Sequence, residues 1–398
     1  MGEWKITILG ELVDIGSSKR IFYKEYVDEG IPFYRSKEVI EKHNRNIIST
    51  ELHISNERFD EIKKKFGVPV EGDMLLTSVG TLGIPYIVEK GENFYFKDGN
   101  LTWFRNFDEN LLNHFLYYWI ISPIGKGELD MVSIGSTQAA LTIIGLKSLE
   151  INLPPFPEQK AIADVLSSLD DKIDLLHRQN KTLEGMAETL FRQRFVEEAQ
   201  DDWEESILNN ILSVKGGTTP STKNSEYWDG EIYWTTPRDL SGNKNIYMFD
   251  TGRKITEQGL AKISSGLLPV GTILLSSRAP IGYLTMTNIQ VAINQGYIAI
   301  LDNKGFSKYF LYLWVKNNLD YIISNANGST FLEISKSVFK SLEIVKPPAD
   351  LRDNFDKQVI PIFQKIKTNS IQIRTLEKLR DTLLPKLISG EVQMEYEN

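Results

Sequence analysis

The chain contains no cysteine, which excludes disulfide bonds and thiolate metal sites. It has only four histidines, none three to five residues from another, so each is interpreted as an ordinary surface or core residue rather than a metal ligand: His43, His53, His114 and His177. No run of 18 apolar residues occurs, and the first residues lack the layout of a signal peptide. We therefore expect a soluble, cytoplasmic protein with neither a metal site nor a membrane span.

A surplus of positive charge is also absent. The 45 Lys and Arg residues are outnumbered by 53 Asp and Glu residues, which gives a net charge of −8. An acidic chain is not expected to coat nucleic acid through uniform phosphate binding. A local basic face remains compatible with this total charge. The length of 398 residues permits two to three domains.

Catalytic motifs are missing as well. The segment Asn152-Leu153-Pro154-Pro155-Phe156 approaches the Asn-Pro-Pro-Phe loop of adenine methyltransferases, but the inserted leucine breaks that tight loop. The chain has no phosphate-binding P-loop, and the glycines at 80 and 83 are too close together for a dinucleotide fingerprint. We predict a non-catalytic protein. An adenine methyltransferase built around residues 152–156 is the weakest alternative, and binding of labelled S-adenosylmethionine to the isolated chain would support it.

The sequence does contain a long internal repeat. KSLEINLPP at 147–155 returns as KSLEIVKPP at 340–348, which is 193 positions later. Further matched segments lie at a similar separation: Trp4 with Trp203, 72–78 with 271–277, Gly83 with Gly282, 114–119 with 309–314, and 135–137 with 328–330. Because the period is about half the chain, the repeat indicates a duplicated domain rather than a solenoid.

Each copy predicts an α+β module followed by a long helix. Short β-branched and aromatic runs, such as 272–276 and 290–301, alternate with Gly, Asn and Pro turns, and aromatic-rich helices are expected at 110–121 and 307–317. The KSLEI segments are interpreted as the closing strand of each module, and the two prolines as the hinge into the helix. The predicted boundaries are 1–156, 157–202, 203–346 and 347–398.

The two long helices carry narrow apolar stripes with steps of three and four, each interrupted by an asparagine, Asn180 or Asn369. Such stripes predict that the helices bury them against each other as a coiled coil. The alternative is that each helix packs only on its own module. Pro361 lies inside the second stripe and predicts a kink or a late helix start.

Polar loops recur at matching positions of the two modules and are the candidate DNA-binding sites. Arg and Lys can read guanine, and Asn and Gln can read adenine, although the same residue types also form ordinary turns. The candidates in the first module are Lys19, Arg20, Arg35, Ser36, Lys37, Thr77, Ser78, Thr81, Asn100 and Gln138. Those in the second are Thr218, Thr219, Lys223, Thr235, Thr236, Arg238, Ser276, Ser277, Arg278, Asn294, Gln295 and Thr330. A repeated scaffold with divergent loops fits the reading of two different sequences.

One family matches these features. LPPFPEQKAIA at 153–163, followed by LSSLDDKI at 166–173, resembles the hallmark segment of the specificity subunits of type I restriction–modification enzymes. LLPKLISGE at 383–391 is similar to the family's C-terminal signature. The resemblance covers the whole chain, in the family's order of two modules and two helices.

The resemblance implies two target recognition domains, each reading half of a split DNA sequence, and an antiparallel helix pair that acts as the spacer. It also implies methyltransferase subunits bound along the helices and a motor-nuclease subunit that joins them. S-adenosylmethionine, ATP and Mg²⁺ then belong to those partners, and this chain carries no cofactor. The candidates for partner contact are Pro157, Glu158, Gln159 and Lys160. The second copy departs from this motif at Ala349-Asp350-Leu351-Arg352, so the two ends are expected to differ.

A duplicated-domain transcriptional repressor is the other binding protein that fits the repeat. A repressor binds its site alone, whereas a specificity subunit requires methyltransferase partners for tight binding. In the specificity reading, helices of 35–40 residues are about 50–60 Å long, and one turn of DNA is about 34 Å. Shortening both helices by equal whole turns should therefore shorten the gap between the half-sites.

Overall fold

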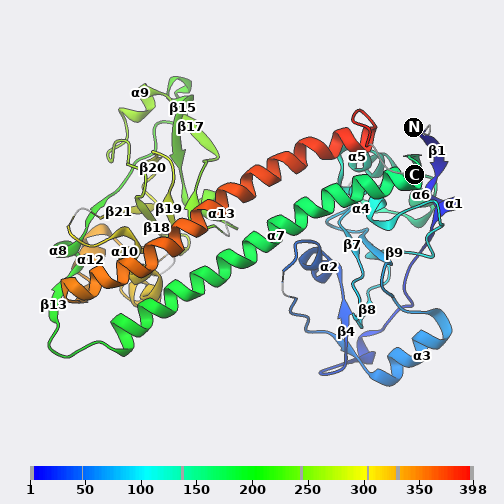
Figure 1. Cartoon of the computed structure of the whole chain (residues 1–398), viewed down its shortest axis with the longest axis horizontal. Helices are drawn as coiled ribbons and strands as arrows, with labels where there is room; N and C mark the ends of the chain where they lie inside the picture. The colour runs from blue at the N-terminus through cyan, green and yellow to red at the C-terminus, as the bar shows by residue number, and fades with distance from the viewer. Residues whose placement is uncertain are drawn as a thin grey trace. The chain divides into compact units, whose positions relative to one another are not determined.

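The computed structural model describes residues 4–46, 48–135, 139–242, 245–302, 304–328 and 332–394. The chain divides into two compact units, which we call unit 1 (Met1–Asp174 with Thr375–Asn398) and unit 2 (Leu175–Arg374). Each unit therefore contains one globular module and a part of each long helix, as the colouring of Figure 1 shows. Within the described residues, no helix has the length and apolar character needed to cross a membrane.

Unit 1 contains two four-stranded sheets. The first has the order β2 (Asp14–Gly16), β9 (Leu101–Arg105), β6 (Met74–Thr77) and β7 (Pro85–Ile87). Its core includes Phe104 and the buried side of α4 (Asn113–Ile121). The second sheet has the order β3 (Tyr26–Val27), β5 (His53–Ile54), β4 (Ile31–Tyr34) and β8 (Tyr95–Phe96), and α2 (Ser36–His43) and α3 (Asn56–Phe66) follow its strands.

Unit 2 repeats this plan. A five-stranded sheet has the order β14 (Ser213–Lys215), β21 (Tyr297–Leu301), β18 (Ile273–Ser277), β19 (Ile281–Thr287) and β16 (Tyr247–Met248). A three-stranded sheet has the order β17 (Arg253–Ile255), β15 (Trp228–Thr235) and β20 (Ala292–Ile293). The helix α10 (Lys308–Asn317) is the counterpart of α4. β4 pairs in parallel with β8 in unit 1, and the equivalent strand β15 pairs in parallel with β20 in unit 2.

The repeated KSLEI segment closes each module, as predicted. β12 (Glu150–Leu153) pairs antiparallel with β1 (Lys5–Ile8), and β22 (Glu343–Lys346) pairs antiparallel with β13 (Glu204–Ile207). The strands begin at the glutamate of the segment rather than at its lysine. The lysine is still part of a short helix, α6 (Ile143–Lys147) in unit 1 and α12 (Lys336–Ser341) in unit 2. The matched first and last segments of each repeat therefore meet in one strand pair.

The long helices are α7 (Phe156–Arg192) and α13 (Ala349–Ser389). α13 continues through Pro361, so the late start expected there is wrong. A proline inside a helix removes one hydrogen bond, which leaves the carbonyl of the residue four positions earlier without its donor. Both Pro361 and Lys357 are exposed, so water can satisfy that carbonyl and the helix can continue.

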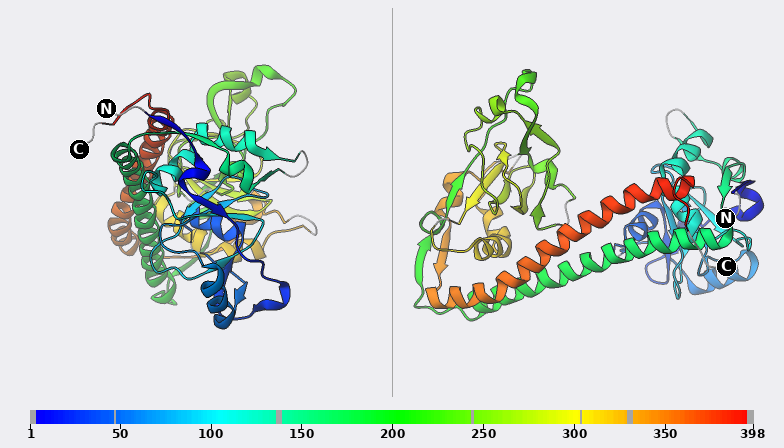
Figure 2. Two further views of the ribbon diagram at one scale, coloured as in Figure 1. Left: turned by 90° about the vertical axis from the view of Figure 1, so that its right-hand side faces the viewer. Right: turned by 45° about the horizontal axis from the view of Figure 1, so that its top comes forward.

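Segments of α7 and α13 contact each other inside each unit. In unit 1, Arg380 donates to Asp170 at 2.9 Å, and Leu166 shares a core with Leu384. In unit 2, Asn369 donates to Asn180 at 2.9 Å, and the rings of Phe191 and Phe355 lie 6.0 Å apart. Residue numbers rise along one helix as they fall along the other, so the segments are antiparallel within each unit (Figures 1 and 2). Both helices also join the module cores. Because the helices contact each other as well as the modules, the alternative in which each helix packs only on its own module is wrong.

Candidate nucleic-acid interface

Four loops of unit 1 converge beside its two sheets. They follow β2, β4, β6 and β8, and comprise residues 17–22, residue 35 with the first two residues of α2, 78–83 and 97–100. The first loop is tied to the last, since Arg20 donates through Nε to Asp98 at 2.7 Å and the Lys19 amide donates to the Tyr95 hydroxyl at 2.6 Å. Backbone bonds join the other loops to the same place, and most of the first-module candidates therefore lie in one cluster.

The matching loops of unit 2 converge in the same way. They follow β14, β15, β18 and β20, and comprise residues 216–223, 236–240, 278–280 and 294–296. Thr219 donates to the side-chain oxygen of Gln295 at 2.7 Å, which joins the first loop to the last. The Thr218 hydroxyl donates to the Lys262 carbonyl at 2.7 Å, which anchors the base of the first loop.

The same backbone hydrogen bonds hold both clusters. The Lys97 amide donates to the Tyr34 carbonyl at 2.8 Å in unit 1, and the Asn294 amide donates to the Thr235 carbonyl at 3.1 Å in unit 2. The Ser78 amide donates to the Asn100 carbonyl at 2.8 Å, and the Ser277 amide donates to the Gly296 carbonyl at 2.8 Å. The frame of the loops is thus repeated, while the exposed side chains on it differ.

Charge is partly compensated within the unit 1 cluster. Asp98 accepts from Arg20 and lies 3.4 Å from the Lys97 ammonium. Partial burial favours the neutral acid, but the hydrogen bond from Arg20 and the charges of both cations outweigh it and lower the pKa of Asp98 below its ordinary value. The Arg35 guanidinium contacts the fully buried Glu38 at 3.1 Å. These carboxylates hold the arginines in fixed orientations at the edge of the cluster.

The unit 2 cluster is richer in neutral polar groups. Gln295 is exposed and uses its oxygen to accept from Thr219, so its amide donors face away from that bond. Asn294 accepts from the Gly296 amide at 2.9 Å. Arg238 is exposed at the start of the second loop, and Arg278 lies 3.5 Å from Glu333. This arrangement presents an amide and a guanidinium, the groups that read adenine and guanine edges.

Five predicted DNA contacts are instead buried: Thr77, Ser78, Thr235, Ser276 and Ser277. The Thr77 hydroxyl accepts from the Ile84 amide at 2.9 Å, and the Ser276 hydroxyl accepts from the Tyr283 amide at 2.8 Å. The Thr235 hydroxyl donates to Asp239 at 3.0 Å. Their repetition in the sequence reflects a repeated turn, not base reading, and we correct their assignment on this ground.

The other candidates lie on or near the surface. The exposed ones are Lys19, Arg20, Lys37, Thr81, Thr219, Lys223, Arg238 and Gln295. The half-buried ones are Arg35, Ser36, Asn100, Thr218, Thr236, Arg278 and Asn294. Gln138 and Thr330 lie outside the described residues. The candidate loop at 97–100 was represented among the predicted contacts only by Asn100, whereas the structure also places Lys97 and Asp98 in the cluster.

Comparison with known proteins identifies the family. The model of the type I restriction modification DNA specificity domain matches residues 1–185 and 200–380. The chain belongs to this DNA specificity family. Family membership sets aside the repressor and methyltransferase alternatives, because a type I specificity subunit is the non-catalytic DNA-recognition component of its system.

Individual relatives agree with this assignment. The MjaIX specificity subunit of Methanocaldococcus jannaschii is 36% identical over 194 residues, which cover 48% of this chain and 45% of that relative, about half its length. The HindI specificity subunit of Haemophilus influenzae is 24% identical over 98% of this chain and 100% of the relative. The crystal structure of the type I S subunit from M. genitalium has a TM-score of 0.62 at 18% identity, with 96% of each chain covered, and supports the fold.

Two residues of the family's hallmark segment, Gln159 and Glu158, make hydrogen bonds within unit 1. Gln159 is fully buried, and its side chain accepts from the Leu112 amide at 2.9 Å and donates to the carbonyls of Asn110 (2.7 Å) and Pro154 (2.9 Å). It thereby caps the N-terminus of α4, whose own N-cap residue makes no side-chain hydrogen bond. We call this tie between the start of the long helix and the module the clamp. Glu158 is also buried and accepts from the Trp4 indole at 3.3 Å. Of the four predicted partner contacts, Pro157 and Lys160 are the exposed ones.

The second copy keeps this clamp with a different residue. Arg352, 193 positions after Gln159, donates to the Pro347 carbonyl at 3.2 Å and to the Gly305 carbonyl at 2.6 Å. Its guanidinium also lies 4.0 Å from the centre of the Phe306 ring. At this position the residue changes, but the tie between helix and module is retained. The expected difference between the two helix starts in partner contact stays a prediction.

The methyltransferase-like segment does not form a catalytic loop. Asn152 lies in β12, is exposed, and pairs with Ile6. Among the described residues, no group of three or more His, Cys, Asp or Glu side chains could hold a metal ion.

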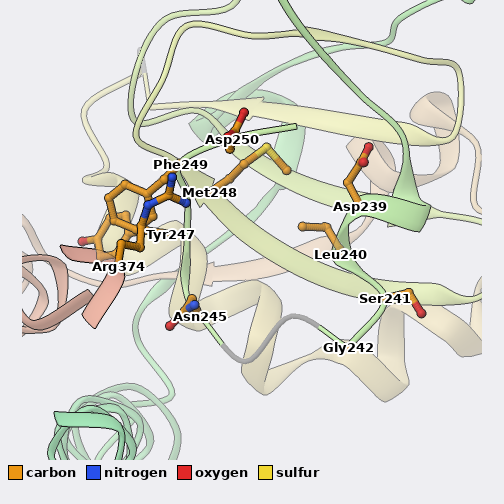
Figure 3. A pocket seen from close by; sticks show the side chains of 10 residues that line it. All are labelled: Asp239, Leu240, Ser241, Gly242, Asn245, Tyr247, Met248, Phe249, Asp250 and Arg374. Atoms are coloured by element: carbon orange, nitrogen blue, oxygen red, sulfur yellow. The ribbon is translucent and has the colours of Figure 1, made fainter. Parts of the chain in front are cut away.

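Unit 2 also contains a small open cavity of about 300 Å³ (Figure 3). At one end, the Arg374 guanidinium lies 5.2 Å from the centre of the Phe249 ring, and the two side chains are adjacent in Figure 3. Asp239 lies toward the other end of the cavity in Figure 3, and its carboxylate accepts hydrogen bonds from the backbone amides of Thr236 and Gly252. That carboxylate therefore serves the loop frame.

Proposed function

We propose that each unit reads one half of a bipartite duplex DNA target through its four-loop cluster. The observation that supports this most directly is the repeated loop frame, held by the same backbone hydrogen bonds in both units while the exposed side chains differ. A repeated frame gives both units the same way of meeting a groove, and different side chains give two different base preferences. DNA contacts by such loops fit the family's specificity role.

In this proposal the two clusters have distinct chemistry. Unit 2 reads with Gln295 and Arg238, whose side chains match adenine and guanine edges. Unit 1 reads with Lys19, Arg20 and Lys37, with Arg20 held in place by Asp98.

We also propose that the chain acts in the cytoplasm with methyltransferase subunits, and through them with a motor-nuclease subunit. S-adenosylmethionine, ATP and Mg²⁺ would be bound by those partners. Pro157 and Lys160 on the first turn of α7 are exposed and stay candidates for subunit contact, whereas Gln159 serves the clamp. In the same proposal, the lengths of α7 and α13 set the gap between the half-sites.

The reading role is tested by substitution followed by mapping of methylated adenines. The chain is expressed with its cognate methyltransferase subunits in a host without other adenine methylation. Gln295→Ala should relax base preference at one position in one half-site, because the side-chain donors are lost, and leave the other half-site unchanged. Arg20→Ala should relax the other half-site.

Gln193→Ala is the matched control, since Gln193 is an exposed glutamine of unit 2 at the end of α7, outside the loops. It should leave the target intact. Equal changes in both half-sites for Gln295→Ala, or no change in either, would show that the loop cluster does not read bases in this way.

A further inference from the structure

A basic surface lies beside the recognition loops of unit 1 and shares only Lys19 with the base-reading candidates. It is formed by α3 and its neighbours (α3 is labelled in Figure 1). We define the lysine surface as Lys19, Lys63, Lys65 and Arg105 around the ring of Phe66.

The helix is anchored so that this surface faces outward. Phe59 and Ile62 are buried, whereas Phe66, on the same side of the helix, is 47% exposed. The Lys19 ammonium lies 5.3 Å from the centre of the Phe66 ring. Arg105 donates to the Phe66 carbonyl at 3.3 Å, and its guanidinium lies 4.3 Å from the centre of the Trp103 ring. Two cations from outside the helix are thus fixed against its last turn.

The lysines of α3 add to this charge on two sides of Phe66. With about 100° between successive helical residues, Lys63 lies about 60° from Phe66 on one side and Lys65 about 100° on the other, whereas Lys64 points away. All three are exposed. Among the ion pairs of the described residues, none involves these lysines. The nearby carboxylate of Glu61 lies 3.0 Å from Arg58 instead.

Stabilisation of the helix end accounts for only part of this arrangement. Cations near a helix C-terminus interact favourably with the helix dipole, and this is an ordinary reason for a lysine in the last turn. That reason does not explain why Lys19 and Arg105 are brought from other elements to the same turn, or why an aromatic ring is left exposed among four cations.

In unit 2, the turn that matches the end of α3 also lies beside a recognition loop. Its counterpart of α3 is the short helix α9 (Glu257–Leu260), and the helices are capped alike by Ser55 and Thr256. After α9, the Ser264 amide donates to the Thr218 hydroxyl at 3.1 Å, and Thr218 is in the first loop of the unit 2 cluster. The turn therefore touches the first loop in both units. Unit 2 has Ser264 and Gly266 at the positions of Lys63 and Lys65. Lys262 and Lys215 lie beside this turn, and Lys215 donates to the Ser265 carbonyl at 3.3 Å.

We propose that the lysine surface binds the phosphate backbone of duplex DNA next to the half-site read by unit 1. This rests on the proposed reading role and adds a sequence-independent anchor to one side of it. Ammonium groups act as point charges toward phosphates and carry no base information. Unit 2 has Ser264 and Gly266 at the positions of Lys63 and Lys65, so substitution of these two lysines tests unit 1 alone.

The test is the salt dependence of duplex binding by the chain assembled with its methyltransferase subunits. Lys63→Gln with Lys65→Gln should weaken binding of target and non-target duplexes by the same factor. The slope of log K against log[salt] should fall by about one for each lysine that contacts a phosphate, about two in total. Lys63→Arg with Lys65→Arg should restore the wild-type slope.

The control pair is Lys64→Gln with Lys126→Gln, which removes the same charge from exposed lysines of the same unit. It should change the slope by clearly less. Equal slopes for the two pairs, or an unchanged slope for Lys63→Gln with Lys65→Gln, would overturn the proposal, provided that thermal unfolding shows both variants folded. If the wild-type assembly did not distinguish target from non-target duplex, the reading role would fail instead, which separates the two outcomes.

Discussion

At the scale of single residues, Thr77 and Ser276 make the same hydrogen bond in the two units. Each hydroxyl accepts from an amide seven positions later, and each side chain is fully buried. A repeated polar residue is therefore a marker of the turn, and the proposed function assigns base reading to residues that differ, such as Arg20 and Gln295.

The first prediction concerns these hydroxyls. Thr77→Val and Ser276→Ala should each lower the free energy of unfolding by about 1–2 kcal/mol, because a buried amide loses its acceptor. The DNA target should not change. Urea unfolding and methylation mapping on the same variants check both parts, and a relaxed half-site in either variant would return these residues to the interface.

Gln159 gives the second prediction. Gln159→Ala leaves one amide and two carbonyls without their partner, and should lower the free energy of unfolding by about 3 kcal/mol. Arg352→Ala should cost less, because Arg352 is only half-buried and water can replace it. Chemical unfolding measures both values. A Gln159→Ala variant of normal stability that fails to bind methyltransferase would favour the partner contact over the clamp.

His43 predicts a pH effect on unit 1. Burial lowers the pKa of His43, although the Pro85 carbonyl and Asp170 act in the opposite direction. The unfolded chain then binds a proton more readily than the folded chain, so this contribution to stability is complete above about pH 6.5 and declines as the pH falls. His43→Gln should make the loss of unfolding free energy between pH 7 and pH 5.5 smaller. An identical pH profile in wild type and variant would rule this out.

At the scale of elements, the long helices carry a polar layer in an apolar seam. In unit 2, Asn369 donates to Asn180 at 2.9 Å, Asn180 donates to Ser370 at 3.3 Å, and the three side chains are buried. Sequence analysis saw these asparagines only as gaps in two stripes. The antiparallel pairing that makes the gaps coincide depends on contacts far apart in the chain, which no local pattern shows.

This layer predicts opposite signs for single and double substitutions. Asn180→Leu alone should lower the free energy of unfolding by about 1–3 kcal/mol, since the buried Asn369 amide loses its acceptor at 2.9 Å and keeps only the long bond to Gln179 at 3.4 Å. Asn180→Leu with Asn369→Leu should raise it above the single variant, toward or beyond the wild type, because an apolar layer replaces a polar one. Additive losses in a double-mutant cycle would contradict the pairing.

Elements were predicted unevenly from the sequence. The repeat placed the closing strands, the two helices and the paired loops, because those features depend on residue spacing. Burial of Thr77 and of Gln159 was not predictable, since polar residues in turns have the same composition whether they face solvent or a backbone amide. The role of Arg352 was hidden for a related reason: two different side chains reach equivalent carbonyls.

At the scale of the whole molecule, the sequence repeat becomes two units with one loop frame and different surface chemistry. Duplication supplies the frame, and in the proposed function divergence at positions such as Arg20 and Thr219 supplies two specificities. The lysine surface is a further divergence, because unit 2 has Ser264 and Gly266 at the positions of Lys63 and Lys65. Family membership and the repeated frame together account for a chain that recognises a split target without a catalytic centre of its own.

The most direct test of this account is the map of methylated adenines for the wild-type assembly and for a chain in which the unit 2 loop residues Thr219, Arg238 and Gln295 are replaced by alanine. The account predicts a bipartite wild-type target and a variant that keeps one half-site and the gap while losing preference in the other half. Loss of both halves together in a folded variant, or an unaltered target, would contradict the assignment of one half-site to each unit.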